Sequence, residues 1–93
     1  MSDDCIHMNI RISGSVQGVG FRYAAMHTAL RMGITGYVRN LPVGDVYIEA
    51  EGSRKNLKEF ISWCNEGPPH AWVKCVEIHE DEWQDFTEFR IFT

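Results

Sequence analysis

The sequence predicts an α+β fold in which two helices cover one face of an antiparallel sheet. Several segments alternate apolar with polar residues, which is the period-two pattern of strands that bury one face. Two other segments repeat apolar residues at three- and four-residue intervals, as helices with one buried side do. Along the 93 residues these segments follow in the order βαββαβ, with a short last strand.

The first strand is predicted over residues 6–13, where isoleucine and methionine alternate with polar side chains. A glycine-rich loop follows over residues 14–20. Helical spacing then runs over residues 21–32, and Gly33 ends the helix because glycine tolerates the positive φ found at helix ends.

A hairpin is predicted next. Residues 37–41 favour a strand, and alternation resumes over residues 46–51. The intervening residues 42–45 contain proline and glycine, which favour a turn. Two antiparallel strands joined by a short loop follow from this pattern.

The second helix is predicted between Ser53, which suits an N-cap, and the break at Gly67-Pro68-Pro69. Its apolar residues fall at i, i+3, i+4 and i+7. They are Leu57, Phe60, Ile61 and Cys64.

Two strands complete the prediction. Residues 72–78 favour a strand, with a possible bulge around Cys75 and Val76 where the alternation slips. Residues 79–82 are predicted as a charged loop, and the final strand is predicted over residues 86–92. The whole order is the split βαβ, or ferredoxin-like, arrangement, which hosts enzymes, regulatory domains and RNA-binding modules.

Composition indicates one domain over residues 1–93, with residues 1–5 as a flexible tail. A net charge of −4 disfavours nucleic acid as a partner. No apolar run is long enough to cross a membrane, and the acidic beginning is unlike a signal peptide. Three cysteines without a close pair favour reduced thiols, so we expect a cytoplasmic protein.

The glycine loop before the first helix predicts an anion site. It holds three glycines within seven residues and leads into a helix N-terminus, whose free N–H groups and dipole favour negative charge. A flexible turn is the alternative interpretation. Arg22 favours the anion site, because a cation in the first helical turn opposes the dipole by about 0.3–1 kcal/mol unless an anion lies beside it.

Familiar phosphate chemistries do not fit the sequence. The loop lacks the glycine and lysine pattern of nucleotide-binding loops. Val16 stands where a cysteine phosphatase would need its nucleophile. The four histidines are scattered, so we expect them on the surface and predict neither a metal site nor a cofactor.

An acyl phosphate suits a site with an arginine and backbone amides but no evident acid or nucleophile. Its leaving group is a carboxylate with a pKa of roughly 4–5, which departs without a proton from a general acid. A positioned water can then attack through a loose transition state.

The segment Gly14 to Tyr23, GSVQGVGFRY, closely resembles the signature loop of the acylphosphatase family, and Gly36 to Asn40, GYVRN, resembles its second signature. The resemblance covers nearly the whole chain after Cys5. It implies a ferredoxin-like fold and hydrolysis of acyl phosphates to a carboxylate and inorganic phosphate, without a metal, cofactor or covalent intermediate.

The resemblance also implies the roles of individual residues. Arg22 would bind the phosphoryl group and Asn40 would hold the attacking water. Backbone amides of the loop would complete the phosphate site; the residues that carry them are Ser15, Val16, Gln17, Gly18, Val19, Gly20 and Phe21. We expect a monomer that is inhibited by the product phosphate.

Two departures from the family pattern are visible. Ser15 stands where the family often has a basic residue, and Val43 stands where it commonly has a polar turn residue. Two other functions stay open. One is a relative specific for carbamoyl phosphate, and the other is a non-catalytic ferredoxin-like module that binds an anion or single-stranded nucleic acid. The acidic Glu49 and Glu51 oppose nucleic acid.

Overall fold

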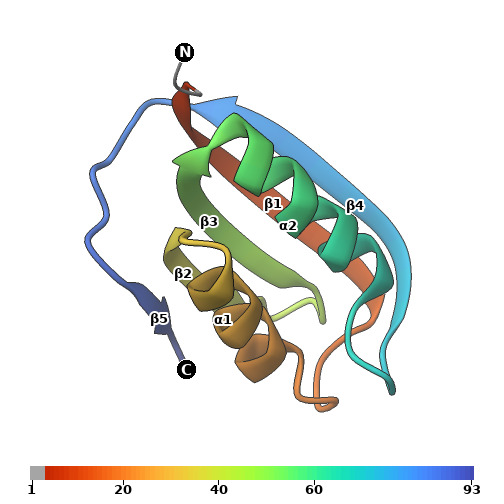
Figure 1. Cartoon of the computed structure of the whole chain (residues 1–93). Coiled ribbons are helices and arrows are strands. Elements are labelled where there is room, and N and C mark those ends of the chain that lie inside the picture. Colours follow the sequence, from red (N-terminus) through yellow and green to blue (C-terminus); the bar gives the residue numbers. More distant parts are fainter. Residues whose placement is uncertain (1–3) are drawn as a thin grey trace.

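A computed structural model describes residues 4–93 and has the predicted order of elements (Figure 1). Its sheet has the strand order β4-β1-β3-β2-β5, and both helices cover the same face (Figure 1). The predicted ferredoxin-like arrangement is confirmed, except that β5 runs parallel to β2. The elements are β1 (Cys5–Ser15), α1 (Phe21–Arg31), β2 (Thr35–Asn40), β3 (Val46–Ser53), α2 (Arg54–Glu66), β4 (Trp72–Asp81) and β5 (Phe89–Ile91).

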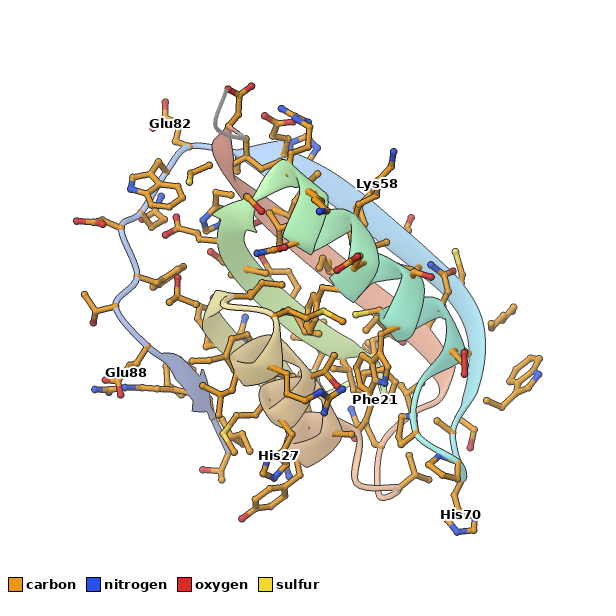
Figure 2. All side chains as sticks on the ribbon, viewed as in Figure 1. Phe21, His27, Lys58, His70, Glu82 and Glu88 are labelled. Atoms are coloured by element: carbon orange, nitrogen blue, oxygen red, sulfur yellow. The ribbon has the colours of Figure 1, made fainter. Side chains whose placement is uncertain are left out.

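The hydrophobic core lies between the helices and the sheet. Phe21 points inward from the first turn of α1, whereas His27, Lys58 and His70 lie on the outside (Figure 2). Burial of this apolar surface holds the helices on the sheet. The fully buried large apolar residues are Ile10, Ile12, Val16, Phe21, Ile34, Val38, Val46, Ile48, Leu57 and Phe60.

The second helix begins as predicted. The Ser53 hydroxyl accepts a hydrogen bond from the Asn56 amide at 3.0 Å, which satisfies one free N–H of the first turn. At the other end, the Gly67 amide donates to the Trp63 carbonyl at 2.7 Å. Gly67 has a φ of 73°, so a residue without a side chain suits this helix end.

The edge strand β4 is longer than predicted. We expected a charged loop over residues 79–82, but His79 to Asp81 belong to the strand. They pair with β1, where Asn9 lies opposite His79 and His7 lies opposite Asp81. Charged side chains are compatible with this strand because it lies at the edge of the sheet and is largely exposed.

The predicted irregularity of β4 lies close to its expected place. Ser13 pairs with Cys75 and Gly14 pairs with Val73, so Lys74 is the extra residue of a bulge. Gly14 has a φ of 130°, and a Cβ there would clash with the Trp72 carbonyl oxygen. Glycine is therefore required where β1 enters the anion loop.

The two ends of the described chain also differ from expectation. Cys5 is not part of a tail, because it pairs with Ser53 at the start of β1; residues 1–3 of the expected tail lie outside the described residues. The last strand covers only Phe89–Ile91. Phe86 lies outside it because its amide donates to the Glu51 side chain at 2.8 Å rather than to a neighbouring strand.

Candidate functional site

The loop over residues 16–20 leaves the amides of the first turn of α1 free. Gly18 and Gly20 have φ values of 74° and 78°, and Gly20 provides no side-chain cap. Ala24 makes the first intrahelical hydrogen bond, from its amide to the Gly20 carbonyl at 3.1 Å. The amides of Phe21 to Tyr23 therefore have no partner inside the helix and can donate to an anion.

A small pocket of about 90 Å³ lies at this helix end. It brings Arg22 and Asn40 together, as the sequence predicts. On the scale where about 10–15 Å³ admits one water, the pocket has room for a few waters or a small anion. The residues that line it are Val16, Gly18, Gly20, Phe21, Arg22, Tyr23 and Asn40.

Arg22 lies in the first turn of α1 and lines the pocket. Its Nη1 donates a hydrogen bond to the backbone oxygen of Phe92 at 2.9 Å. Within residues 4–93, no carboxylate lies close enough to Arg22 to form an ion pair. The guanidinium is therefore held by a neutral acceptor and keeps further donors for an anion.

Asn40 is the last residue of β2 and faces the same side of the sheet as the buried Val38. Its Oδ1 is buried and has no hydrogen-bond partner among the described residues. A buried oxygen of this kind calls for a donor, such as a water held in the pocket. Arg39, the preceding residue of the strand, faces the other way, and its guanidinium carbon lies 5.5 Å from the centre of the Tyr47 ring.

The remaining loop residues divide between the pocket and its surroundings. Val16, Gly18, Gly20 and Phe21 line the pocket, whereas Ser15, Gln17 and Val19 do not. Ser15 is exposed at the end of β1. The contacts of Gln17 could not be predicted locally, because its side chain bonds to the turn after β2, which lies far along the chain.

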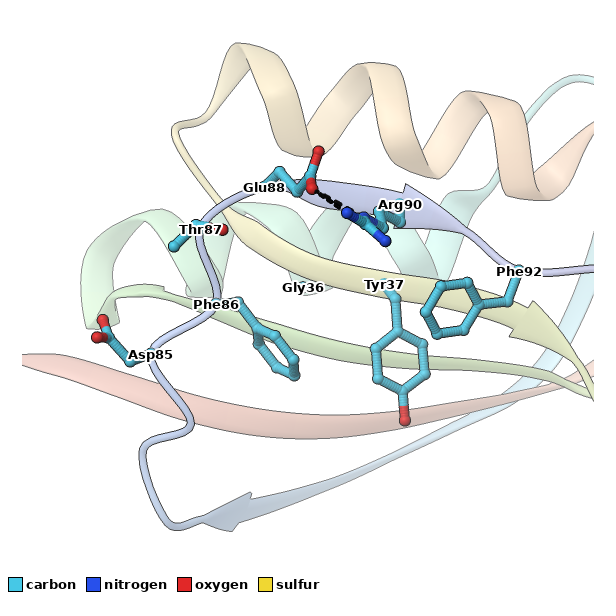
Figure 3. A pocket seen from close by; sticks show the side chains of 8 residues that line it. All are labelled: Gly36, Tyr37, Asp85, Phe86, Thr87, Glu88, Arg90 and Phe92. Atoms are coloured by element: carbon cyan, nitrogen blue, oxygen red, sulfur yellow. Dashed lines mark hydrogen bonds and ion pairs between the residues drawn. The ribbon is translucent and has the colours of Figure 1, made fainter.

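A different pocket, of about 280 Å³, lies along β5 (Figure 3). It includes Arg90, but the Arg90 Nε donates to Glu88 at 2.8 Å, so this cation is already paired. Tyr37 and Phe92 stack at a centroid distance of 4.8 Å beside it. This pocket contains neither Arg22 nor Asn40 and offers no unpaired cation to an anion.

Comparisons with known proteins identify the family. The sequence model described as acylphosphatase matches residues 8–91, which include the whole pocket. The chain belongs to the acylphosphatase family. An acylphosphatase of Archaeoglobus fulgidus is 45% identical over 92% of this chain and 97% of that protein. The structure of an acylphosphatase from Coxiella burnetii has a TM-score of 0.93 and 36% identity, over 96% of this chain and 94% of that one.

A second acylphosphatase structure, from Bacillus subtilis, has a TM-score of 0.92 and 31% identity over 95% of this chain and 99% of that one. Family membership thus agrees with the pocket and the fold. In the described part of this acylphosphatase-family chain, no helix is long and apolar enough to span a bilayer. Nor do residues 4–93 contain a group of three or more histidine, cysteine or acidic side chains arranged for a metal ion.

The face of the sheet opposite the helices carries a polar cluster that the sequence analysis missed. We expected all four histidines on the surface, but His7 is only 1% exposed. Its Nδ1 lies 2.7 Å from a Glu51 oxygen and its Nε2 lies 2.9 Å from a Glu49 oxygen. Tyr37 and Tyr47 both donate to the other Glu49 oxygen, at 2.8 and 3.0 Å.

This cluster sets the charges of its members. Burial lowers the pKa of His7, but hydrogen bonds with Glu51 and Asn9 and the charges of both glutamates outweigh it, so the pKa is raised above 6.5. Burial alone would raise the pKa of Glu51. Hydrogen bonds from the Gln84 amide, from His7 and from the Phe86 amide outweigh this and lower it. The two residues meet because of the register of β1 on β3, which places His7 opposite Glu51.

Proposed function

We propose that the chain hydrolyses acyl phosphates to a carboxylate and inorganic phosphate. The observation that carries the proposal is the small pocket in which Arg22, the free amides at the start of α1 and the unpartnered Asn40 oxygen meet. Membership of the acylphosphatase family supports the same activity.

In this proposal the loop and Arg22 bind the phosphoryl group. The amides of Phe21 to Tyr23 would donate to phosphoryl oxygens, aided by the helix dipole. Arg22 uses one donor on Phe92, and its remaining donors would bind the oxygens that gain charge in the transition state. Because these groups are fixed before the substrate arrives, little reorganisation accompanies the reaction.

Asn40 would place the attacking water. Its Oδ1 can accept a hydrogen bond from that water, while its Nδ2 can donate to a phosphoryl oxygen. Water held in this way is oriented for in-line attack on phosphorus. The reaction then needs no covalent intermediate.

An acyl phosphate is the substrate class that suits this chemistry. Attack by water breaks the bond between phosphorus and the bridging oxygen, and the carboxylate leaves with the electron pair. A carboxylate with a pKa of roughly 4–5 departs unprotonated near neutral pH, so no general acid is required. An alkyl phosphate would release a far more basic alkoxide and is expected to react poorly.

A comparison of the turnover of acetyl or benzoyl phosphate with the turnover of a simple alkyl phosphate tests the proposal. We expect efficient hydrolysis of the acyl phosphates only, with full activity in excess EDTA, because Arg22 and the loop amides carry the charge stabilisation. Loss of activity that zinc or magnesium restores would contradict the metal-independent mechanism. Equal turnover of the alkyl phosphate would contradict the assigned chemistry.

We further propose that the protein acts as a monomer in the cytoplasm and that inorganic phosphate inhibits it. Arg22 and Asn40, to which we assign the reaction, both belong to this chain, so the proposed chemistry needs no residue of a second copy. The three cysteines are free thiols, which suits a reducing compartment. Phosphate would compete with the substrate because both use the same amides and Arg22.

Binding of single-stranded nucleic acid is not favoured. A ferredoxin-like RNA-binding module presents aromatic side chains on its open sheet face for stacking with bases. Here the hydroxyls of Tyr37 and Tyr47 are bonded to Glu49, and Glu51 follows two residues later on the same face of β3. These carboxylates would repel a phosphate backbone.

A further inference from the structure

Gln17 joins the two segments that flank the candidate active site, namely the loop before α1 and the turn after β2. Its Nε2 donates one hydrogen bond to the Leu41 carbonyl at 2.8 Å and another to the Asp45 carbonyl at 2.9 Å. Gln17 belongs to the loop before α1, whereas both acceptors belong to the turn between β2 and β3. Within residues 4–93, no other side-chain hydrogen bond joins this loop to this turn.

The two carbonyls are the ones that close the turn. The Leu41 amide donates to the Asp45 carbonyl at 2.8 Å, and the Gly44 amide donates to the Leu41 carbonyl at 3.0 Å. Gln17 therefore adds a second hydrogen bond to each acceptor. It bonds to the turn at the point where the chain leaves Asn40, because Leu41 is the next residue.

The link lies directly beside residues that line the pocket. Val16 and Gly18, on either side of Gln17, line the pocket together with Asn40. The Gln17 side chain does not line it, and both donors of its amide are used. Gln17 thus cannot bind phosphate through its side chain while it holds the turn.

We propose that Gln17 is a positioning residue, which fixes Asn40 over the phosphate loop so that the water attacks in line. This inference rests on the proposed function. Small displacements of a positioning group cost rate rather than ground-state affinity. Loss of the link should therefore lower kcat while the affinity for phosphate, which the loop amides and Arg22 supply, changes little.

The test compares Gln17→Met, which keeps the length of the side chain but removes both donors, with the wild type. We expect kcat for benzoyl phosphate to fall about tenfold or more, and the inhibition constant of inorganic phosphate to stay within about threefold. Gln84→Met is the matched control, because Gln84 is an exposed glutamine whose side chain also donates to a carbonyl, that of Glu82. It should keep kcat.

A double-mutant cycle separates positioning from a structural role. If Gln17 acts through Asn40, Gln17→Met should change kcat by less than about twofold in an Asn40→Ala background. Equal losses in both backgrounds would overturn the proposal. A folded Gln17→Met protein with a lowered Tm but normal kcat would overturn it as well, since the link would then serve stability alone.

A readout without turnover keeps this inference separate from the proposed function. The side-chain amide resonances of Asn40, measured by NMR with phosphate present, should shift in Gln17→Met and stay unchanged in Gln84→Met. If the wild type hydrolyses no acyl phosphate, the proposed function fails, and these resonances still decide the positioning role. Resonances that do not move in Gln17→Met would overturn it.

Discussion

The Nη1 of Arg22 donates a hydrogen bond to the backbone oxygen of Phe92, 2.9 Å away, across 70 residues of sequence. This bond links the start of α1 to the segment that follows β5. The Phe92 amide in turn donates to the Val38 carbonyl of β2 at 2.9 Å. The guanidinium is thus held from outside its own helix, by backbone that is anchored to the strand ending in Asn40.

Removal of residues 92 and 93 should weaken the site. Without the Phe92 carbonyl, Arg22 is free to adopt other rotamers, so we expect kcat/KM to fall about tenfold. Phe92→Ala is the control, because it removes the stacking on Tyr37 but keeps the carbonyl. It should lower the Tm and leave kcat/KM within about twofold. Equal losses in both variants would show that the ring, not the carbonyl, matters.

Arg22→Ala should abolish most of the phosphate affinity. It removes the guanidinium from the pocket, so inorganic phosphate should inhibit weakly and turnover should fall by about 10³-fold or more. Arg22→Lys should resemble the alanine variant, since an ammonium lacks the planar pair of donors. Calorimetric titration with phosphate and steady-state kinetics measure the two effects. Near-normal turnover in the lysine variant would show that charge alone suffices.

Asn40→Ala should fail in a different way. Phosphate affinity should stay within a few-fold of the wild type, whereas kcat should fall by about 10²–10³ because the water is no longer held in line. The same kinetics and titration apply, with circular dichroism to confirm folding. Loss of phosphate binding as complete as in Arg22→Ala would contradict a role centred on water.

Stability should depend on pH through His7 and Glu51. Because the folded pKa of His7 lies above 6.5, the stability that its proton contributes is complete below about pH 6.5 and is lost as pH rises through the folded pKa. The pKa of Glu51 lies below 4.5, so its contribution is complete above about pH 4.5 and is lost as pH falls through the folded pKa. The urea midpoint should therefore be lower at about pH 8.5 than at about pH 5.5.

Two variants test this assignment. His7→Gln should remove most of the fall in the urea midpoint on the alkaline side. His79→Gln is the control, because His79 is an exposed histidine on the neighbouring strand β4, and it should keep the wild-type slope. If the urea midpoint of His7→Gln still falls between about pH 5.5 and pH 8.5 as it does in the wild type, the titrating group is a different residue.

Local patterns in the sequence predicted most of the fold. Alternation in β1 and helical spacing in α2 report burial within one element, so they do not depend on its neighbours. The glycine loop and Arg22 were also visible, because a cation at a helix N-terminus is locally unfavourable. The structure places Arg22 and Asn40 in one pocket, while their catalytic roles stay predictions for the variants above.

The missed features depend on contacts between distant segments. His7 is polar and lies in a strand, so alternation placed it at the surface; only the pairing of β1 with β3 brings Glu51 opposite it. Gln17 looked like any loop residue, because its partners lie 24 and 28 residues further along the chain. Phe86 fitted a strand by propensity, yet its amide donates to Glu51.

The length of β4 bears on how the protein behaves at high concentration. Within the described residues, β4 is the end strand of the sheet, so one side of its backbone has no neighbouring strand. A long free edge can recruit the edge of another copy and start aggregation. Here the acidic Glu77, Glu80 and Asp81 would repel the same residues of a second chain, and the bulge at Lys74 interrupts a regular ladder. Charges on this strand, two of which lie in the stretch that sequence analysis assigned to a loop, would therefore oppose self-association through this edge.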